Sequence, residues 1–152
     1  MRSPAIILLL AATLLPAPGL AQSTVRSDRG LYLTLFRSPA TGIEIRSGHA
    51  AAYAGYYPTV IRSNGVLANT NFIRAGATYY LRKQGATPYI SPSVVWSLDN
   101  DWKNGALTEL GLRGRLYKSL NGRLGVAALT TVGRRVRVNP TVGLDLKLGS
   151  GR

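Results

Sequence analysis

The sequence predicts an all-β chain of eight short antiparallel strands closed into an up-and-down barrel. Apolar and polar residues alternate with a period of two along most of the chain, which is typical of strands. Tight, glycine-containing links alternate with longer, more polar links, as consecutive hairpins require. Because the strand number is even, the first strand starts and the last strand ends beside the tight turns, which indicates a barrel of this topology.

The first three strands carry the weaker signals. Residues 31–37 alternate, although both faces are fairly apolar. Residues 42–46 place two isoleucines opposite Glu44 and Arg46, and residues 50–57 are rich in Ala and Tyr. Since each segment is short and bounded by turn-forming residues, we expect a strand in each case.

The five later strands alternate more clearly. They are expected at residues 72–82, 89–98, 107–118, 123–132 and 141–148. The apolar face should include Leu110, Leu112, Leu146 and Leu148, and the opposite face should include Glu109, Arg113, Asp145 and Lys147. The facing of these residues therefore tests which side of the barrel is apolar.

Two kinds of link join the strands. The tight links are expected at 47–48, 83–87 and 118–122. The longer links are expected at 38–41, 58–71, 99–104 and 133–140. The two kinds alternate along the chain, so each kind should occupy its own end of the barrel.

Composition excludes several classes of site. The chain has 152 residues, no Cys and one His, which excludes disulfide scaffolds, cysteine zinc sites and thiol nucleophiles and disfavours a His-rich metal site. We therefore predict no metal and no cofactor. The net charge is +13, yet only 16% of residues are charged, fewer than the roughly 25% usual in soluble domains.

The N-terminal residues resemble a secretory signal peptide. A short basic start, Met1 to Ser3, precedes an apolar run over residues 5–15, and a Pro-containing break ends with Gly19 and Ala21 at the −3 and −1 positions. The run is too short for a transmembrane helix, which needs about 20 apolar residues. We expect a cleaved leader at residues 1–21 and one domain at residues 22–152.

The alternation alone does not decide which face meets solvent. A soluble sandwich or lipocalin-like cup points its apolar face inward, whereas an outer-membrane barrel points it toward lipid. The polar face here is rich in small residues, which suit a narrow eight-stranded lumen. It also carries charges of both signs that could pair inside a lumen, namely Glu44, Arg46, Arg74, Glu109, Arg113, Arg115, Asp145 and Lys147.

Aromatic residues near the predicted strand ends also favour a membrane, because Tyr and Trp concentrate at bilayer interfaces. Their strand preference is an alternative explanation. The residues concerned are Tyr32, Tyr56, Tyr57, Tyr79, Tyr80, Tyr89, Trp96, Trp102 and Tyr117.

The last strand resembles the C-terminal assembly signal of outer-membrane barrels, with Thr141, Gly143, Leu146 and Leu148 at the signal positions. It departs from that signal because its final residue is Leu rather than aromatic and residues 149–152 follow. Over roughly residues 30–148 the chain resembles small, uncharacterised eight-stranded outer-membrane barrels of Gram-negative bacteria. The resemblance implies the fold, the outer membrane as location and the outer-membrane assembly machinery as a partner, but no activity.

The sequence offers little catalytic chemistry. Some small outer-membrane barrels modify lipid A with a His and a Ser, and those groups must lie within hydrogen-bond reach. The single His, His49, follows Ser47 in a tight turn and has no obvious acid partner. Asp99 and Asp101 lack the ligand number of a calcium loop. We therefore predict no catalytic residues.

A basic run marks the last of the longer links. Arg134, Arg135 and Arg137 suit contact with lipopolysaccharide phosphates, although a solvated loop is an alternative interpretation. Nucleic acid fits poorly, since no recognition element is present.

Together, these observations predict a monomeric, non-enzymatic outer-membrane barrel with a packed lumen and a structural or surface-interaction role, in contact with outer-membrane lipid and lipopolysaccharide. Two alternatives are a lipid A-modifying enzyme of the deacylase or acyltransferase type and a soluble, periplasmic lipocalin-like binder.

Overall fold

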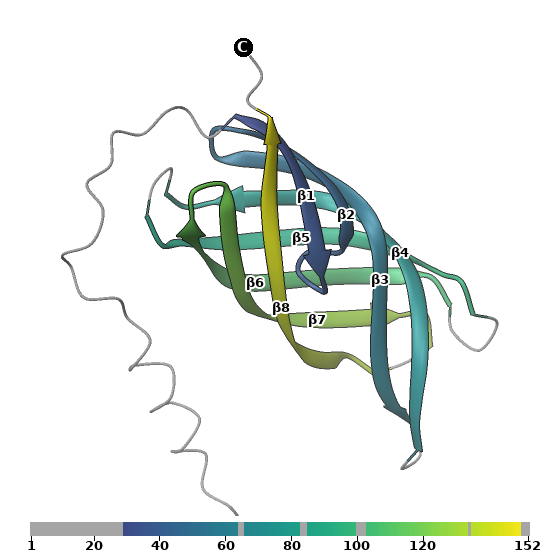
Figure 1. The fold of residues 1–152 in the computed structure, drawn as a ribbon. Helices are drawn as coiled ribbons and strands as arrows, with labels where there is room; N and C mark the ends of the chain where they lie inside the picture. The colour runs from purple at the N-terminus through teal and green to yellow at the C-terminus, as the bar shows by residue number, and fades with distance from the viewer. Residues whose placement is uncertain (1–28, 64–65, 83–84, 100–102, 134, 150–152) are drawn as a thin grey trace, which may run out of the picture.

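The computed structural model describes residues 29–63, 66–82, 85–99, 103–133 and 135–149. The predicted leader lies outside these ranges. Eight strands form one closed antiparallel barrel in chain order, which confirms the predicted fold class (Figure 1). They are β1 (Gly30–Phe36), β2 (Thr41–Ser47), β3 (Ala50–Ser63), β4 (Val66–Tyr80), β5 (Thr87–Ser97), β6 (Gly105–Tyr117), β7 (Leu120–Thr131) and β8 (Arg137–Gly149). Within the described ranges, no helix is long and apolar enough to cross a membrane.

The barrel closes where the first strand pairs with the last. Leu33 lies opposite Leu146, and Phe36 lies opposite Gly143. The end where β1 begins and β8 ends, here called the near end, also holds the links β2–β3, β4–β5 and β6–β7. The β2–β3 link turns at Gly48, whose φ of 64° is readily adopted by glycine. The remaining links lie at the opposite, far end.

Two of the predicted longer links are wrong in extent. The segment 58–71 is mostly a continuation of β3 and β4, which stay paired from Pro58 opposite Asn71 to Ser63 opposite Val66. Strand β8 begins at Arg137, inside the predicted link 133–140. The strand pairs β3–β4 and β7–β8 therefore extend well beyond the β1–β2 hairpin at the far end (Figure 1).

The apolar face of the strands points outward. Leu110 and Leu112 are 58% and 52% exposed, and Leu146 and Leu148 are also exposed. On the other face of the same strands, Glu109, Arg113 and Asp145 are buried inside the barrel. The predicted facing of these residues is thus found, apart from Lys147, which is only half-buried. This arrangement of apolar and charged side chains is the reverse of that in a soluble protein, in which apolar side chains fill the interior.

The expectation that the aromatic residues lie at the outer rims holds for only part of the set. Tyr56, Tyr79, Trp96 and Tyr117 are exposed on the outside, and Trp102 lies outside the described residues. The aromatic residues that point into the lumen and are buried are Tyr32, Tyr57, Tyr80 and Tyr89. They occupy inward positions because strand parity, rather than residue type, fixes the side to which each side chain points.

Candidate functional site

The lumen nearest the near end contains an ionic cluster, here called the inner cluster: Glu44, Arg46, Arg113, Arg123 and Asp145. The Arg123 Nη2 donates to Glu44 Oε2 at 2.5 Å, and its Nε donates to Asp145 Oδ1 at 2.8 Å. The Arg113 Nε donates to Asp145 Oδ2 at 3.0 Å, and the Arg46 guanidinium pairs with Glu44. All five side chains are at least nine-tenths buried, so these charges depend on one another for stabilisation.

Two tyrosines hold the Arg46 guanidinium within this cluster. Its Cζ lies 4.2 Å from the centroid of the Tyr32 ring and 4.4 Å from that of the Tyr80 ring. The Tyr80 hydroxyl donates to Glu44 Oε1 at 3.0 Å. Cation–π contacts of this kind gain strength when water is excluded, so the tyrosines contribute packing and charge stabilisation together.

A second polar group, here called the central cluster, surrounds Glu109 in the middle of the lumen. Its carboxylate accepts from Arg74 Nη1 at 2.9 Å, Tyr89 OH at 2.6 Å and Thr141 Oγ1 at 2.9 Å. It also accepts a hydrogen bond from the Ser38 hydroxyl. The central cluster therefore joins strands from both halves of the barrel to the β1–β2 link.

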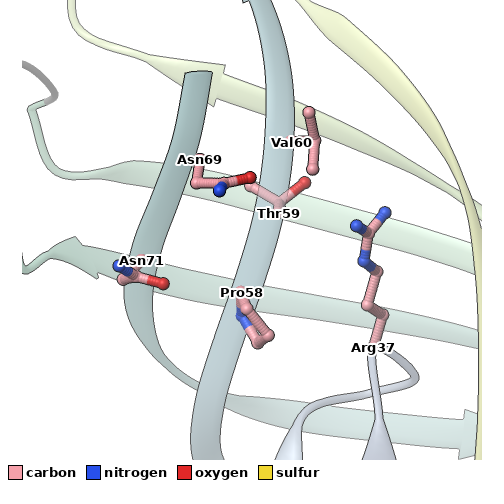
Figure 2. Close-up of a pocket in the computed structure, with 6 residues that line it drawn as sticks. All are labelled: Arg37, Pro58, Thr59, Val60, Asn69 and Asn71. Carbon is pink, nitrogen blue, oxygen red and sulfur yellow. The ribbon is translucent and has the colours of Figure 1, made fainter. Parts of the chain in front are cut away.

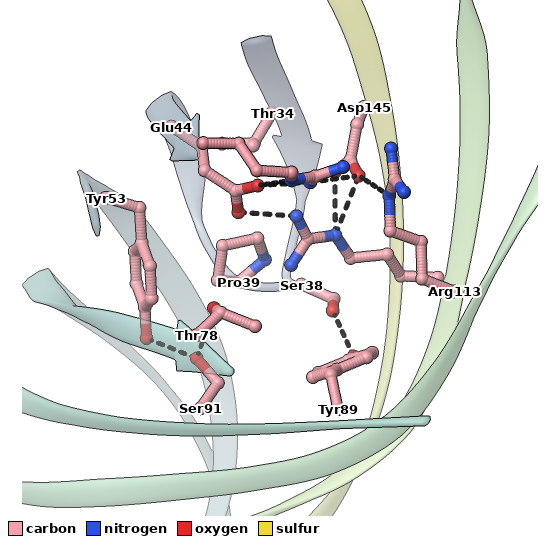
Figure 3. A network of polar contacts seen from close by, with 12 residues as sticks. Thr34, Ser38, Pro39, Glu44, Tyr53, Thr78, Tyr89, Ser91, Arg113 and Asp145 are labelled. Carbon is pink, nitrogen blue, oxygen red and sulfur yellow. Dashed lines mark hydrogen bonds and ion pairs between the residues drawn. The ribbon is translucent and has the colours of Figure 1, made fainter. Parts of the chain in front are cut away.

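The β1–β2 link folds into the lumen as an internal plug. Ser38, Pro39 and Ala40 are all buried, and Figure 3 shows Ser38 and Pro39 inside the barrel below the inner cluster. Arg74 Nη1 donates to the Pro39 carbonyl, and Thr34 Oγ1 donates to the Ala40 carbonyl at 2.6 Å. The link therefore occupies part of the lumen beside the central cluster.

Toward the far end the lumen contains an apolar cluster, with the buried Thr59, Thr70 and Thr131 beyond it. Its buried cluster consists of Ala40, Tyr57, Phe72, Val95, Leu107, Ala127 and Leu129. We expected this face to carry mainly small and polar residues, and the structure corrects that expectation at this end. These side chains are at most 1% exposed, so they pack closely in this part of the lumen.

Not every residue predicted for the lumen charges joins these clusters. Arg115 is exposed at the end of β6, where the pairing with β7 shifts register between Arg115 and Tyr117. Lys147 is half-buried, with its Nζ 5.8 Å from the Tyr32 ring. Arg115 and Lys147 both lie close to the near ends of their strands, outside the buried clusters.

The structure adds two lumen residues that were not among the predicted charges. Arg123 lies on the inward face, as its alternation indicates, and contacts both carboxylates of the inner cluster. Ser38 lies in a predicted link, and nothing in its local sequence indicates that it is buried. Parity of the strand could have identified Arg123, whereas Ser38 required the three-dimensional path of the link.

The residues that resemble an assembly signal divide between the two faces of β8. Leu146 and Leu148 point outward, while Thr141 points inward to Glu109. A Cβ added at Gly143 would lie 2.1 Å from the Ser38 carbonyl oxygen. Gly143 therefore allows the plug to pack directly against β8. Recognition by the assembly machinery stays a prediction.

The predicted basic run is only partly described. Arg134 lies outside the described residues, Arg135 is exposed, and Arg137 is the first residue of β8. The Arg137 side chain is half-buried, and its Nε is buried with no hydrogen-bond partner among the described residues. Contact with lipopolysaccharide stays a prediction.

The single histidine contacts two consecutive tyrosines of β4. His49 Nδ1 lies 2.6 Å from the Tyr80 carbonyl oxygen, and its ring stacks on Tyr79 with centroids 5.7 Å apart. Neither of these contacts involves a Ser hydroxyl or a carboxylate. Within the described ranges, no group of three or more His, Cys, Asp or Glu side chains could hold a metal ion.

The comparisons with known proteins give no family: no protein-family model, no curated protein and no solved structure matches the chain.

Proposed function

We propose that this chain is an integral outer-membrane β-barrel with a sealed lumen and a structural or surface-interaction role. The observation that carries the proposal is the inverted polarity of the barrel, whose lumen contains buried charged groups and whose outer wall exposes apolar side chains. An exposed apolar belt of this kind is costly in water and favourable in a bilayer, where closed barrels satisfy all backbone hydrogen bonds between strands.

The sealed lumen supports a role without transport through the barrel. The inner cluster, the central cluster with its plug, and the apolar cluster follow one another from the near end to the far end. A structural or surface role therefore suits this chain better than a pore. We also propose that the chain is monomeric and non-enzymatic.

Membrane fractionation tests the proposal. The full chain, exported from a Gram-negative host, should sediment with outer membranes, resist extraction at high pH and dissolve in detergent. It should migrate faster on a gel before boiling than after, as folded outer-membrane barrels do. Recovery of the folded chain in the soluble periplasmic fraction would contradict the proposal and favour the lipocalin-like alternative.

Conductance measurements test the sealed lumen separately. Purified, folded protein in planar bilayers should produce no stepwise channel currents. Discrete, reproducible steps would show that the lumen opens and would refute the second half of the proposal.

A further inference from the structure

The barrel wall has a lateral notch at the far end. Strand β2 starts at Thr41, which lies opposite Tyr56, so residues 57–63 of β3 pair with β4 alone. Strand β1 ends at Phe36, and residues 137–141 of β8 pair with β7 alone. At roughly 3.3 Å per residue, the unpaired edges are about 15–20 Å long. The notch is the name used here for this interruption of strand pairing, which is bounded by the two edges as its sides and by the β1–β2 link as its floor (Figure 1).

Two hydrogen bonds connect the parts of the notch. The Arg37 amide donates to the Val142 carbonyl at 3.1 Å, which anchors the floor to β8. The described contact that bridges the two sides is a long hydrogen bond of 3.5 Å from Asn139 Nδ2 to Thr59 Oγ1. The sides therefore approach through side chains rather than through strand pairing.

Both unpaired edges contain proline. Pro58 lies on β3 and Pro140 lies on β8, each within the segment that pairs on one side only. Proline has no amide hydrogen and protects an edge against strand addition. An extended peptide is for this reason a poor occupant of the notch.

An open depression of about 370 Å³ lies at the β3 side of the notch. It is lined by Arg37, Pro58, Thr59, Val60, Asn69 and Asn71, and Figure 2 shows the Arg37 guanidinium extending from the end of β1 toward β3. No hydrogen bond or ion pair joins this guanidinium to a described residue. The depression thus combines a cation with hydroxyl and carboxamide groups, of which the Asn71 carboxamide oxygen also accepts from the Tyr56 hydroxyl, and this combination suits a phosphate.

The β8 side of the notch is also cationic. The Arg137 Nε is buried without a hydrogen-bond partner among the described residues, and Arg137 is two residues from Asn139 on the same face of the strand. Three of the four described carboxylates lie in the lumen clusters, and the fourth, Asp99, accepts the backbone amide hydrogen of the lining residue Asn71 at 2.6 Å. None of the six described residues that line the depression has a carboxylate.

Apolar side chains flank these cations on the outside of the wall. Val60 on β3 and Val138 on β8 are 37% and 65% exposed. A ligand in the notch would therefore meet cations within the wall and apolar surface beside it. That combination matches a phosphate carried on acyl chains better than a free phosphate ion.

We propose that the notch is a binding site for the phosphate of an anionic lipid headgroup, with Arg37 and Arg137 as the principal donors. The proposal rests on the proposed membrane location, which gives the notch access to lipid from the side. It assigns a specific lipid contact to Arg37 in the β1–β2 link and to Arg137 on β8, and Arg37 is not part of the basic run in the sequence.

Three probes test the proposal on the full folded chain in nonionic detergent micelles, with folding verified by gel mobility. They are short-chain phosphatidic acid, the matching diacylglycerol and inorganic phosphate, and binding is measured by native mass spectrometry and calorimetry. Phosphatidic acid should bind best. R37Q and R137Q should each weaken its binding about tenfold, the effect of losing one charge-assisted contact.

R115Q is the matched control, because Arg115 is exposed at the near end and its loss changes net charge equally. Its affinity should stay within about twofold of the parent. Equal losses in R37Q, R137Q and R115Q would show nonspecific charge attraction and overturn the site. Equally tight binding of diacylglycerol or of inorganic phosphate, or no binding of phosphatidic acid, would also overturn it.

These outcomes are separate from those of the proposed function. A chain that sediments with membranes but fails the lipid test retains the proposed function and loses only the site. A chain found in the soluble fraction loses the proposed function whatever it binds in micelles.

Discussion

Replacing Asp145 by Asn perturbs the inner cluster most directly. Asp145 lies within ion-pair distance of three guanidinium groups, at 2.8 Å from Arg123, 3.0 Å from Arg113 and 3.5 Å from Arg46. The substitution leaves those three cations facing one carboxylate, Glu44, in a region without solvent exposure. Breaking a buried ion pair by removing one partner costs about 3–5 kcal/mol, and we expect D145N to destabilise the barrel by that amount.

The assay is reversible unfolding in urea with the protein folded into phospholipid vesicles, followed by tryptophan fluorescence. D99N is the matched control, because it makes the same chemical change at a carboxylate outside the lumen that accepts one amide hydrogen bond. Loss of that bond should cost about 1 kcal/mol. If D145N costs no more than D99N, the inner cluster does not contribute to stability and the reasoning is refuted.

A second substitution makes the electrostatic origin testable. Adding R113M to D145N removes one of the uncompensated cations and fills its volume with an apolar side chain. The double variant should recover at least about 1 kcal/mol relative to D145N, since neighbouring charges couple. A strictly additive loss would show that shape, rather than charge, explains the cost.

Three further predictions use other parts of the barrel. L110R places a cation on the outer wall between Ile90 and Val126 and should lower the free energy of unfolding in vesicles by about 2–4 kcal/mol. The control L116R, near the strand end, should lower it by at most about 1 kcal/mol. Equal losses would argue against an apolar membrane belt. G143A should destabilise the barrel by about 1–3 kcal/mol, because the added Cβ would meet the Ser38 carbonyl oxygen. The control G114A has open space around the added Cβ and should change stability by less than about 0.5 kcal/mol. Similar values for the two variants in the unfolding assay would disprove close packing of the plug. H49A should leave the acylation pattern of lipid A unchanged in a host that expresses the chain, and an altered pattern by mass spectrometry would favour the enzyme alternative.

The strands and their facing were predictable because a period of two in the sequence maps directly onto the two faces of a pleated strand. The exposed Leu110 and Leu112 and the buried Glu109 follow from that rule alone. The far-end limits of the strands were not predictable in the same way. Pro58 and the Asn residues near Asn71 are typical of loops, yet the β3–β4 hairpin continues through them.

The notch explains that error in physical terms. Proline is excluded from a strand that is paired on both sides but tolerated on an edge. Because the β1–β2 hairpin is short, β3 becomes an edge strand beyond Tyr56, and Pro58 falls within that edge. The sequence alone does not reveal where a neighbouring strand stops. From the sequence, Pro58 therefore indicates a loop rather than an edge strand.

The ionic lumen was predictable as a set of inward charges but not as a set of partners. Glu44 pairs with Arg123 across 79 residues of chain, and Arg46 lies near Asp145 across 99 residues. Such pairs form only when β1 and β2 meet β7 and β8, which is the step that closes the barrel. The buried charges are costly in a barrel that has not closed and satisfied in one that has. The arginines and carboxylates that pair in the lumen therefore favour the closed barrel over open sheets of the same strands. This preference for closure gives a physical reason for charged residues in the interior of a chain that has few of them.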